Sequence, residues 1–197
     1  MHDTIDIHGI ITMHKIPDWT DEELVYWWMP ETELGEDNLY HIVRPARISD
    51  EAKMQRCIAR TENMLTNAGM SSLLTDLSLS GIGSLNPLNQ ILSVGNGTFT
   101  GPTRTLSAVS GDGFTSGARK APASYSVVGF QTTLVTNYGS GDAVGTLTNI
   151  GFYGVNTGSG QQATTTTGTG QLNTVAAFTF VKGASSYAFN YVFQLTN

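Results

Sequence analysis

Three glycines near the middle of the chain are the first candidates for chemistry. The stretch LSVGNGTFTGP, residues 92–102, places Gly95, Gly97 and Gly101 directly after an apolar run. A glycine-rich turn binds phosphate when it opens a helix, because the first N–H groups of that helix point at the anion. The residues that follow do not predict a helix, and the lysine of a nucleotide-binding loop is missing. We therefore interpret the stretch as a turn that ends a strand, with Gly95 and Gly97 at positive φ.

Two aspartates could supply acid–base chemistry. Asp112 lies in SGDGF and Asp142 in GSGDA, and a glycosidase needs two carboxyl groups that flank a sugar bond. An aspartate between glycines more commonly stabilises a turn through its own side chain. Residues 63–197 also contain no histidine or cysteine that could activate a nucleophile. We predict turn roles for both aspartates, no catalytic residue and no enzymatic activity.

Three histidines are spaced by six residues. His2, His8 and His14 would share one face of a continuous strand, and a trimer could bring such rows together at its axis and bind a metal ion. The closer spacing that is usual for metal ligands is missing. We therefore predict three surface histidines, with no metal and no cofactor.

A tryptophan-rich segment is the candidate docking element. In TDEELVYWWMP, Thr20 and Glu23 form a capping box that opens a short helix. Leu24, Trp27 and Trp28 then fall on one face of that helix. Such a face is either local core or an anchor that inserts into a partner protein, since aromatic anchors dominate interface energetics. Leu24, Trp27 and Trp28 are our candidate partner-docking residues.

The first 62 residues predict a mixed α+β arm. Alternation over residues 5–16 predicts a strand with a bulge or a close backbone approach at Gly9. Residues 39–48 predict another extended segment. Over residues 49–65, apolar side chains at helical spacing predict a helix.

Residues 63–197 predict a β domain. Leucines in residues 66–81 predict one short packed helix, and turn-rich segments separate the strands that follow. The final strand alternates strictly, which predicts one buried aromatic face. We expect a mainly β fold, an antiparallel β-sandwich or partly open barrel over about 63–197 that should fold without the arm. Its strands are predicted at residues 89–95, 123–139, 145–156, 172–181 and 185–197.

The distribution of charge separates the two parts. Residues 1–62 carry 13 of the 16 acidic and 6 of the 10 basic groups, so residues 63–197 keep only seven charges. A free monomer usually stays soluble through its charge, so we expect neighbouring subunits to cover part of this uncharged surface. We place the domain boundary near residue 62, between an N-terminal docking segment, 1–62, and the β domain, 63–197.

Charge and hydropathy also exclude some partners. The net charge is -6 and no basic stripe is present, which argues against a nucleic-acid partner. No apolar stretch is long enough for a membrane helix, and the first residues do not have the pattern of a secretory signal. We therefore expect that the protein is synthesised in a cytoplasm and does not insert into a membrane.

Several turns and strands together resemble small structural proteins of tailed bacteriophages. The matching positions are an Asn-Leu-x-x-Asn-x-Gly-like segment leading into an apolar helix, a strand that ends in a Gly-Asn-Gly-Thr turn, a Gly-Ser-Gly-Asp-Ala turn and a strand with glycine before an aromatic pair. In this chain they are residues 63–69, 94–98, 139–143 and 149–153. The resemblance covers roughly residues 63–197. Residues 15–62 have no counterpart, and the loop 156–170 is expanded.

This resemblance implies a virion component, assembled in the host cytoplasm and associated with the tail, collar or fibres. The implied partners are further copies of the chain, in a number that the sequence does not define, and portal, adaptor, tail or capsid subunits. Two alternatives stay open. One is a capsid-decoration or head-fibre protein, and the other is a receptor- or carbohydrate-binding module whose 156–170 loop contacts a host surface glycan.

Overall fold

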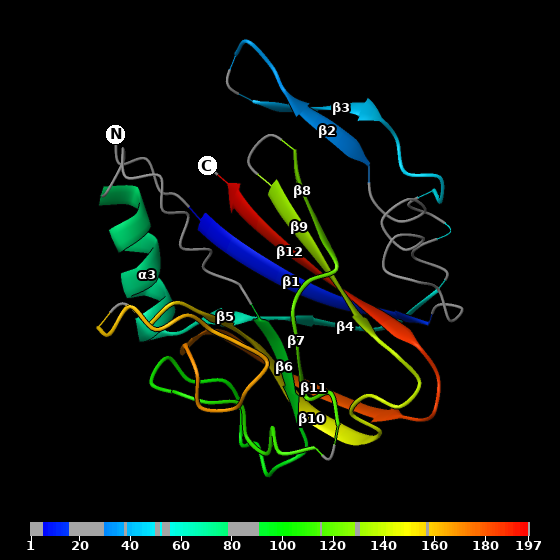
Figure 1. Cartoon of the computed structure of the whole chain (residues 1–197), viewed down its shortest axis with the longest axis vertical. Coiled ribbons are helices and arrows are strands. Elements are labelled where there is room, and N and C mark those ends of the chain that lie inside the picture. The colour runs from blue at the N-terminus through cyan, green and yellow to red at the C-terminus, as the bar shows by residue number, and fades with distance from the viewer. Residues whose placement is uncertain are drawn as a thin grey trace. The chain divides into compact units, whose positions relative to one another are not determined.

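The structure is a computed structural model of the whole chain, and it is mainly β (Figure 1). Its strands form antiparallel sheets, and the described strands do not close into a barrel. The predicted fold class, a β-sandwich-like arrangement with a short packed helix, is therefore confirmed. The described residues are 6–15, 30–37, 39–49, 52, 56–78, 91–114, 116–128, 131–156 and 158–196.

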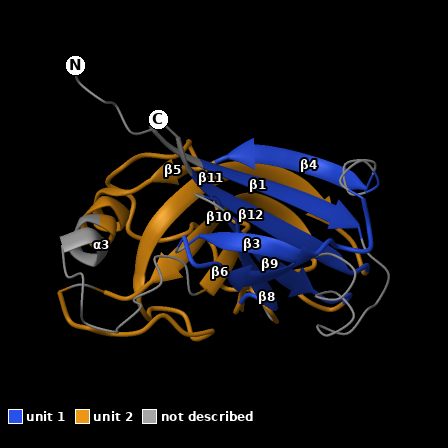
Figure 2. Cartoon of the chain, turned by 90° about the horizontal axis from the view of Figure 1, so that it is seen from above, with its two compact units in different colours: residues 1–62, 122–140, 185–197 blue, residues 63–121, 141–184 orange. Residues whose placement is uncertain are grey.

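The chain divides into two compact units, which Figure 2 shows in separate colours. Unit 1 consists of residues 1–62, 122–140 and 185–197, and unit 2 of residues 63–121 and 141–184. One boundary falls directly after Glu62, and the chain then crosses between the units three more times. Unit 1 thus combines the N-terminal segment with two later segments.

Unit 1 is built on a five-stranded antiparallel sheet. Its strands, in spatial order, are β4 (Cys57–Glu62), β1 (Asp6–Lys15), β12 (Tyr187–Thr196), β9 (Gln131–Tyr138) and β8 (Ser124–Val128). β1 pairs with β12 along its whole length, from Asp6 opposite Thr196 to Lys15 opposite Tyr187. A chain that began at Asn63 would lack both β1 and β4, so β12 would lose one of its two neighbours. Deletion of residues 1–62 would therefore perturb the sheet as well as any docking function.

Both faces of β12 are buried near its start. Phe189 and Tyr191 point one way and are buried, as the alternating pattern predicts, and Tyr138 packs edge-on against Phe189 at 5.0 Å between ring centroids. Ala188 and Asn190 on the opposite face are also buried. The alternation identified the aromatic face correctly but did not indicate that the small residues are covered too.

In the first 62 residues, the helix predicted within residues 49–65 is wrong, and the strand predicted at residues 5–16 is confirmed by β1 but without the bulge that was one of two alternatives at Gly9. Residues 57–62 form the strand β4, where a helix was expected. Its half-buried and exposed side chains alternate with the period of two that a strand requires. β1 also runs through Gly9 without a bulge, because Gly9 pairs regularly with Phe193, and the register shift lies at Met13 and His14 against β4. The extended segment at 39–48 is confirmed by β3 (Tyr40–Arg44), which pairs with β2 (Glu31–Leu34) in a sheet of their own.

Unit 2 is built on a second five-stranded antiparallel sheet. Its strands, in spatial order, are β5 (Met64–Leu65), β11 (Gln171–Lys182), β10 (Gly145–Gly154), β6 (Ile91–Gly95) and β7 (Arg119–Lys120). All five residues of β6 are buried. A strand buried on both faces reads as a continuous apolar run, which is why residues 89–95 were recognisable in the sequence.

The predicted helix is α3 (Asn67–Ser78), and it packs against β11. Thr66 caps its N-terminus, because the Thr66 hydroxyl accepts a hydrogen bond from the Gly69 N–H at 3.0 Å and donates one to the Leu172 carbonyl at 2.6 Å. A Cβ atom on Gly69 would collide with the backbone oxygen of Asn173. Glycine at this position therefore lets the first turn of α3 approach the strand closely.

Candidate functional site

The predicted docking residues Leu24, Trp27 and Trp28 lie outside the residues that the structure describes. Their role, and that of residues 1–62 as a docking segment, stays a prediction. The groups that the structure brings together are in unit 2, around β7.

Gly95 and Gly97 allow their segment to lie close to the segment of Ser110 and Gly111. Neither Gly95 nor Gly97 has a positive φ, so that prediction is wrong, although Gly101 does, at 126°. The N–H groups of Asn96 and Gly97 donate to the carbonyls of Gly111 and Ser110, at 3.1 and 3.0 Å. A Cβ atom at Gly95 would collide with the Ser110 carbonyl. Because these donors already bind backbone carbonyls, the turn does not present them to a phosphate.

Asn149 and its neighbour Thr148 bind the same two segments, which are those of Gly97 and Ser110. The amide oxygen of Asn149 accepts a hydrogen bond from the Ser110 N–H at 2.8 Å, and its amide nitrogen donates to the Ser110 carbonyl at 2.9 Å. The neighbouring Thr148 hydroxyl donates to the Gly97 carbonyl at 2.7 Å. A buried side-chain amide thus replaces a strand neighbour for Ser110.

Arg119 is the centre of the interactions around β7. Its side chain is 2% exposed, and its Nε lies 3.0 Å from Asp112 Oδ2. One terminal nitrogen, Nη1, donates to the carbonyls of Thr166 and Thr169, at 3.2 and 3.1 Å. The guanidinium also lies over the Tyr153 ring, 3.9 Å from its centroid. A single buried cation therefore connects the segment around Asp112 with Tyr153 and with the loop at Thr166 and Thr169, which lie 47 and 50 residues further along the chain.

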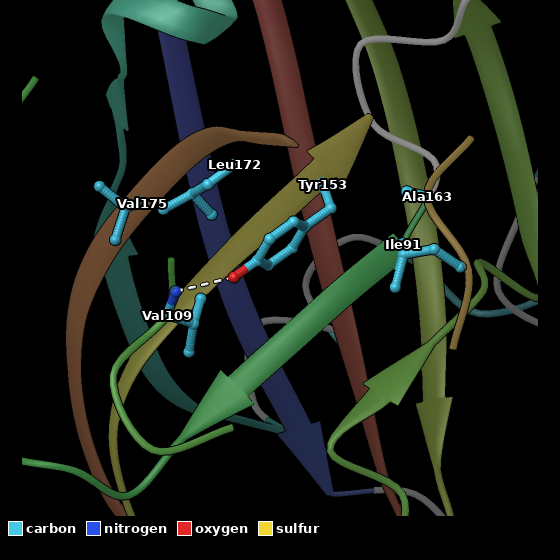
Figure 3. Packing of buried hydrophobic residues seen from close by; sticks show 6 residues of the cluster. All are labelled: Ile91, Val109, Tyr153, Ala163, Leu172 and Val175. Atoms are coloured by element: carbon cyan, nitrogen blue, oxygen red, sulfur yellow. Dashed lines mark hydrogen bonds between the residues drawn. The ribbon is translucent and has the colours of Figure 1, made fainter. Parts of the chain in front are cut away.

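Tyr153 links this arginine to the apolar core of unit 2. Its ring packs in a cluster of buried residues that Figure 3 shows, and its hydroxyl accepts a hydrogen bond from the Val109 N–H at 2.8 Å. Burial raises the pKa of Tyr153 above its ordinary value, and Arg119 opposes only part of that rise. The phenol is therefore a neutral structural group over the ordinary pH range. The other members of the cluster are Ile91, Val109, Ala163, Leu172 and Val175.

The loop 156–170 is attached to the rest of unit 2 at Ala163, Thr166 and Thr169. Ala163 is buried in the apolar cluster, and Arg119 binds the carbonyls of Thr166 and Thr169. At the start of the loop, the Asn156 side chain accepts a hydrogen bond from the Gly158 N–H at 3.0 Å, an Asx turn. A segment rich in Gly, Thr and Gln is typical of a flexible loop, whereas here the backbone is bound to Arg119.

Threonines organise the outer part of this loop. The Thr169 hydroxyl donates to the Thr166 carbonyl at 2.8 Å and accepts from the Thr164 N–H at 2.9 Å. Residues 164–167 are nevertheless exposed to solvent. The loop thus presents hydroxyl groups on a backbone that is held in place.

A second group of charges lies on the other side of β7. Lys120 Nζ lies 2.8 Å from Asp142 Oδ2, and both side chains are part-buried. Lys182 at the end of β11 is buried as well. Burial lowers the pKa of the Lys182 amine, Asp142 opposes this shift and Lys120 adds to it.

The structure assigns ion pairs to both candidate carboxyl groups. Asp112 pairs with Arg119 and Asp142 with Lys120, a role that the predicted turn function did not include. The signal in the sequence was the scarcity of charge, since residues 63–197 hold only seven charged side chains and five of them belong to these two groups. Tyr153 had no local signal, because its neighbours come from distant segments.

The histidine prediction is wrong for His14. His14 is buried in β1, and its Nε2 lies 2.8 Å from the Thr12 hydroxyl. His2 lies outside the described residues, as does the side chain of His8. Within the described parts of the chain, no three His, Cys, Asp or Glu side chains gather as metal ligands would.

Two further findings complete the description of the site. None of the described helices is long and apolar enough to cross a membrane. No family model, curated protein or solved structure matches this chain. The resemblance to phage structural proteins therefore depends on the sequence pattern alone.

Proposed function

We propose that this chain is a structural subunit of a tailed-phage particle, homo-oligomeric and attached near the tail, collar or fibres through residues 1–62. The proposal follows from the sequence resemblance and from how unit 2 uses its charged groups. Its neighbours in the particle would be portal, adaptor, tail or capsid subunits.

The observation that carries the proposal is that the charged side chains around β7 are buried or form ion pairs with one another. Arg119 and Asp112 bind each other, Lys120 binds Asp142, and Lys182 is buried. These groups connect loops to the sheet, as expected of a protein whose task is to keep its shape. Arg104 is a charged residue on the surface of unit 2, but the described surface of this unit is mainly uncharged Thr, Gly, Ser and Asn, which favours burial against neighbouring subunits over isolation in solvent.

The test is to look for the chain in purified particles. A tagged copy is expressed during growth of the phage whose genome encodes it, and particles are separated on a density gradient and analysed by mass spectrometry. We expect the chain in a fixed stoichiometry, and electron microscopy of the labelled particle then distinguishes the tail from the head, where a decoration or head-fibre protein would lie. Absence from the particles, with abundant chain in the lysate, would contradict the proposal.

The second candidate function is recognition of a host surface glycan by the loop 156–170. It is favoured by the exposed hydroxyls of residues 164–167 on a backbone that Arg119 holds. A preordered polar loop loses little conformational entropy on binding. A glycan array probed with the full chain tests this function, and binding that persists after residues 164–167 are all replaced by alanine would exclude the loop as the contact surface.

A further inference from the structure

The hairpin β2–β3 of unit 1 exposes an apolar face. Thr32 lies opposite Ile42, and Leu34 lies opposite Tyr40. Directly opposed residues of an antiparallel pair point to the same side, so these four side chains share one face. Leu34, Tyr40 and Ile42 are between 41% and 57% exposed. The hairpin therefore carries three large apolar side chains that the described chain leaves about half in water.

The hairpin needs a partner for energetic reasons. A two-stranded sheet is at best marginally stable by itself in water. Its ion pairs, Arg44 with Glu31 and His41 with Asp37, are exposed and contribute little. Both strands contact β8, whose Tyr125 is 74% exposed. Contiguous exposed apolar side chains of this kind mark an interaction surface.

The charges of β2 and β3 favour a second copy of the chain, in head-to-tail orientation, as the partner of the hairpin. β2 carries Glu31 and Glu33 and no base, whereas β3 carries His41 and Arg44 and no acid. A two-fold contact that placed β2 against β2 would oppose like charges, which is destabilising. A head-to-tail contact places the acidic strand of one copy beside the basic strand of the next. Because β2 and β3 are antiparallel within the hairpin, copies related by rotation about a common axis would continue the same antiparallel pattern.

We propose that the hairpin β2–β3 is the contact between subunits of a homo-oligomer, with β2 of one copy antiparallel to β3 of the next copy, so that apolar side chains of the two copies become cross-strand neighbours on one face. This inference rests on the proposed function only for its homo-oligomeric state. Heterologous contacts of this type close into a ring when the rotation between copies closes, and otherwise they form an open filament.

The first experiment compares two matched pairs of substitutions in the full chain. Leu34→Thr with Ile42→Thr removes apolar side chains from the hairpin, and Val144→Thr with Val181→Thr removes exposed valines from unit 2 as a control. Mass photometry at a series of concentrations should show at least a ten-fold weaker association for the hairpin variant and no change for the control, with circular dichroism spectra of both unchanged from the wild type. Equal association of the two variants would overturn the proposal.

The second experiment reads the orientation of the contact. In a Cys57→Ser background, copies with Thr32→Cys or Leu34→Cys are mixed with copies carrying Tyr40→Cys or Ile42→Cys, and the mixtures are oxidised. Disulfide-linked dimers that contain one chain of each kind support the head-to-tail contact. Dimers of two β2 cysteines, formed by one variant alone, or no cross-link in any mixture, would contradict it.

The outcomes separate this inference from the proposed function. An oligomer that survives the hairpin substitutions without cross-links removes the hairpin contact and leaves the structural role intact. A cross-linked ring from a chain that never enters particles keeps the contact and removes the virion role. A stable monomer at micromolar concentration overturns the homo-oligomer on which both depend.

Discussion

Two arginine–carboxylate pairs of nearly equal length lie in opposite surroundings in the two units. Arg119 Nε lies 3.0 Å from Asp112 Oδ2 in unit 2, and Arg44 Nη1 lies 3.2 Å from Glu31 Oε2 in unit 1. The Arg119 side chain is 2% exposed and the Arg44 side chain 70%. The distances alone would rank the pairs as equals. Their surroundings predict very different costs of losing one partner, because a buried charge without its partner cannot recover its hydration.

The difference also separates what each pair can do. Arg119 has several further partners, which are the carbonyls of Thr166 and Thr169 and the ring of Tyr153, so it fixes the position of a loop on the sheet. Arg44 lies at the end of the exposed strand β3, and its partner Glu31 is also exposed to solvent. Buried charge thus fixes a loop in unit 2, whereas the charged side chains of the hairpin in unit 1 lie in solvent.

The largest effect is expected from Arg119→Met. The substitution leaves the Asp112 carboxylate, which is only 21% exposed, without its cation, and it leaves two carbonyls without their donor. Removal of one partner of a buried pair costs about 3–5 kcal/mol. Urea unfolding followed by circular dichroism measures the loss, and hydrogen exchange should show faster exchange in residues 156–170.

Arg119→Lys serves as the conservative control for that variant. Lysine keeps the charge but cannot supply the planar fork that contacts Asp112 and the loop carbonyls together, so an intermediate loss is expected. It remains informative if Arg119→Met does not fold. A loss of less than about 1 kcal/mol for the methionine variant would contradict the structural role of Arg119.

Tyr153→Phe should have the next largest effect. It removes the acceptor of the buried Val109 N–H, and an unsatisfied buried donor costs about 1–3 kcal/mol. The substitution keeps the ring beside Arg119, so the loop contacts remain. The free energy of unfolding at neutral pH measures this cost, and a variant as stable as the wild type would contradict it.

The same variant has a distinct pH dependence. The pKa of Tyr153 is raised in the folded state, so its contribution to stability is complete below the ordinary tyrosine value of about 10 and is lost as the pH rises through the folded value. Lys182 has the opposite sign, since its pKa is lowered by burial, but it titrates in both proteins. The stability difference between wild type and Tyr153→Phe should therefore shrink above about pH 10. A constant difference at all pH values would exclude this titration.

The sequence predicted the fold where the signals are local. Alternation identified β12, a continuous apolar run identified β6, and the leucine spacing identified α3. The β-rich class follows from these elements. Each of these three patterns lies within a single segment. It can therefore be recognised without knowing which other segments pack against it.

Errors arose where a short segment fits two periods or where a distant segment decides. Residues 57–62 are too few to separate a helical from a strand period, and pairing with β1 decides for the strand. Gly95 and Gly97 are required because Ser110 lies close to both of them. Ser110 is outside residues 92–102, so the pattern of that stretch does not indicate this contact. The Arg119 site was missed for the same reason, because the carbonyl groups that it binds belong to Thr166 and Thr169, 47 and 50 residues away.

The smallest effect is expected from Arg44→Met. The pair with Glu31 is exposed on both sides, so its contribution to the stability of the monomer is about 0–1 kcal/mol and weakens with salt. Urea unfolding of this variant at low and high salt, beside Arg119→Met, tests whether burial rather than distance determines the energy of the two pairs. Because the pairs differ by only 0.2 Å in length, similar losses for the two variants would mean that the burial contrast does not act on stability. A several-fold larger loss for Arg119→Met would assign the difference to its surroundings.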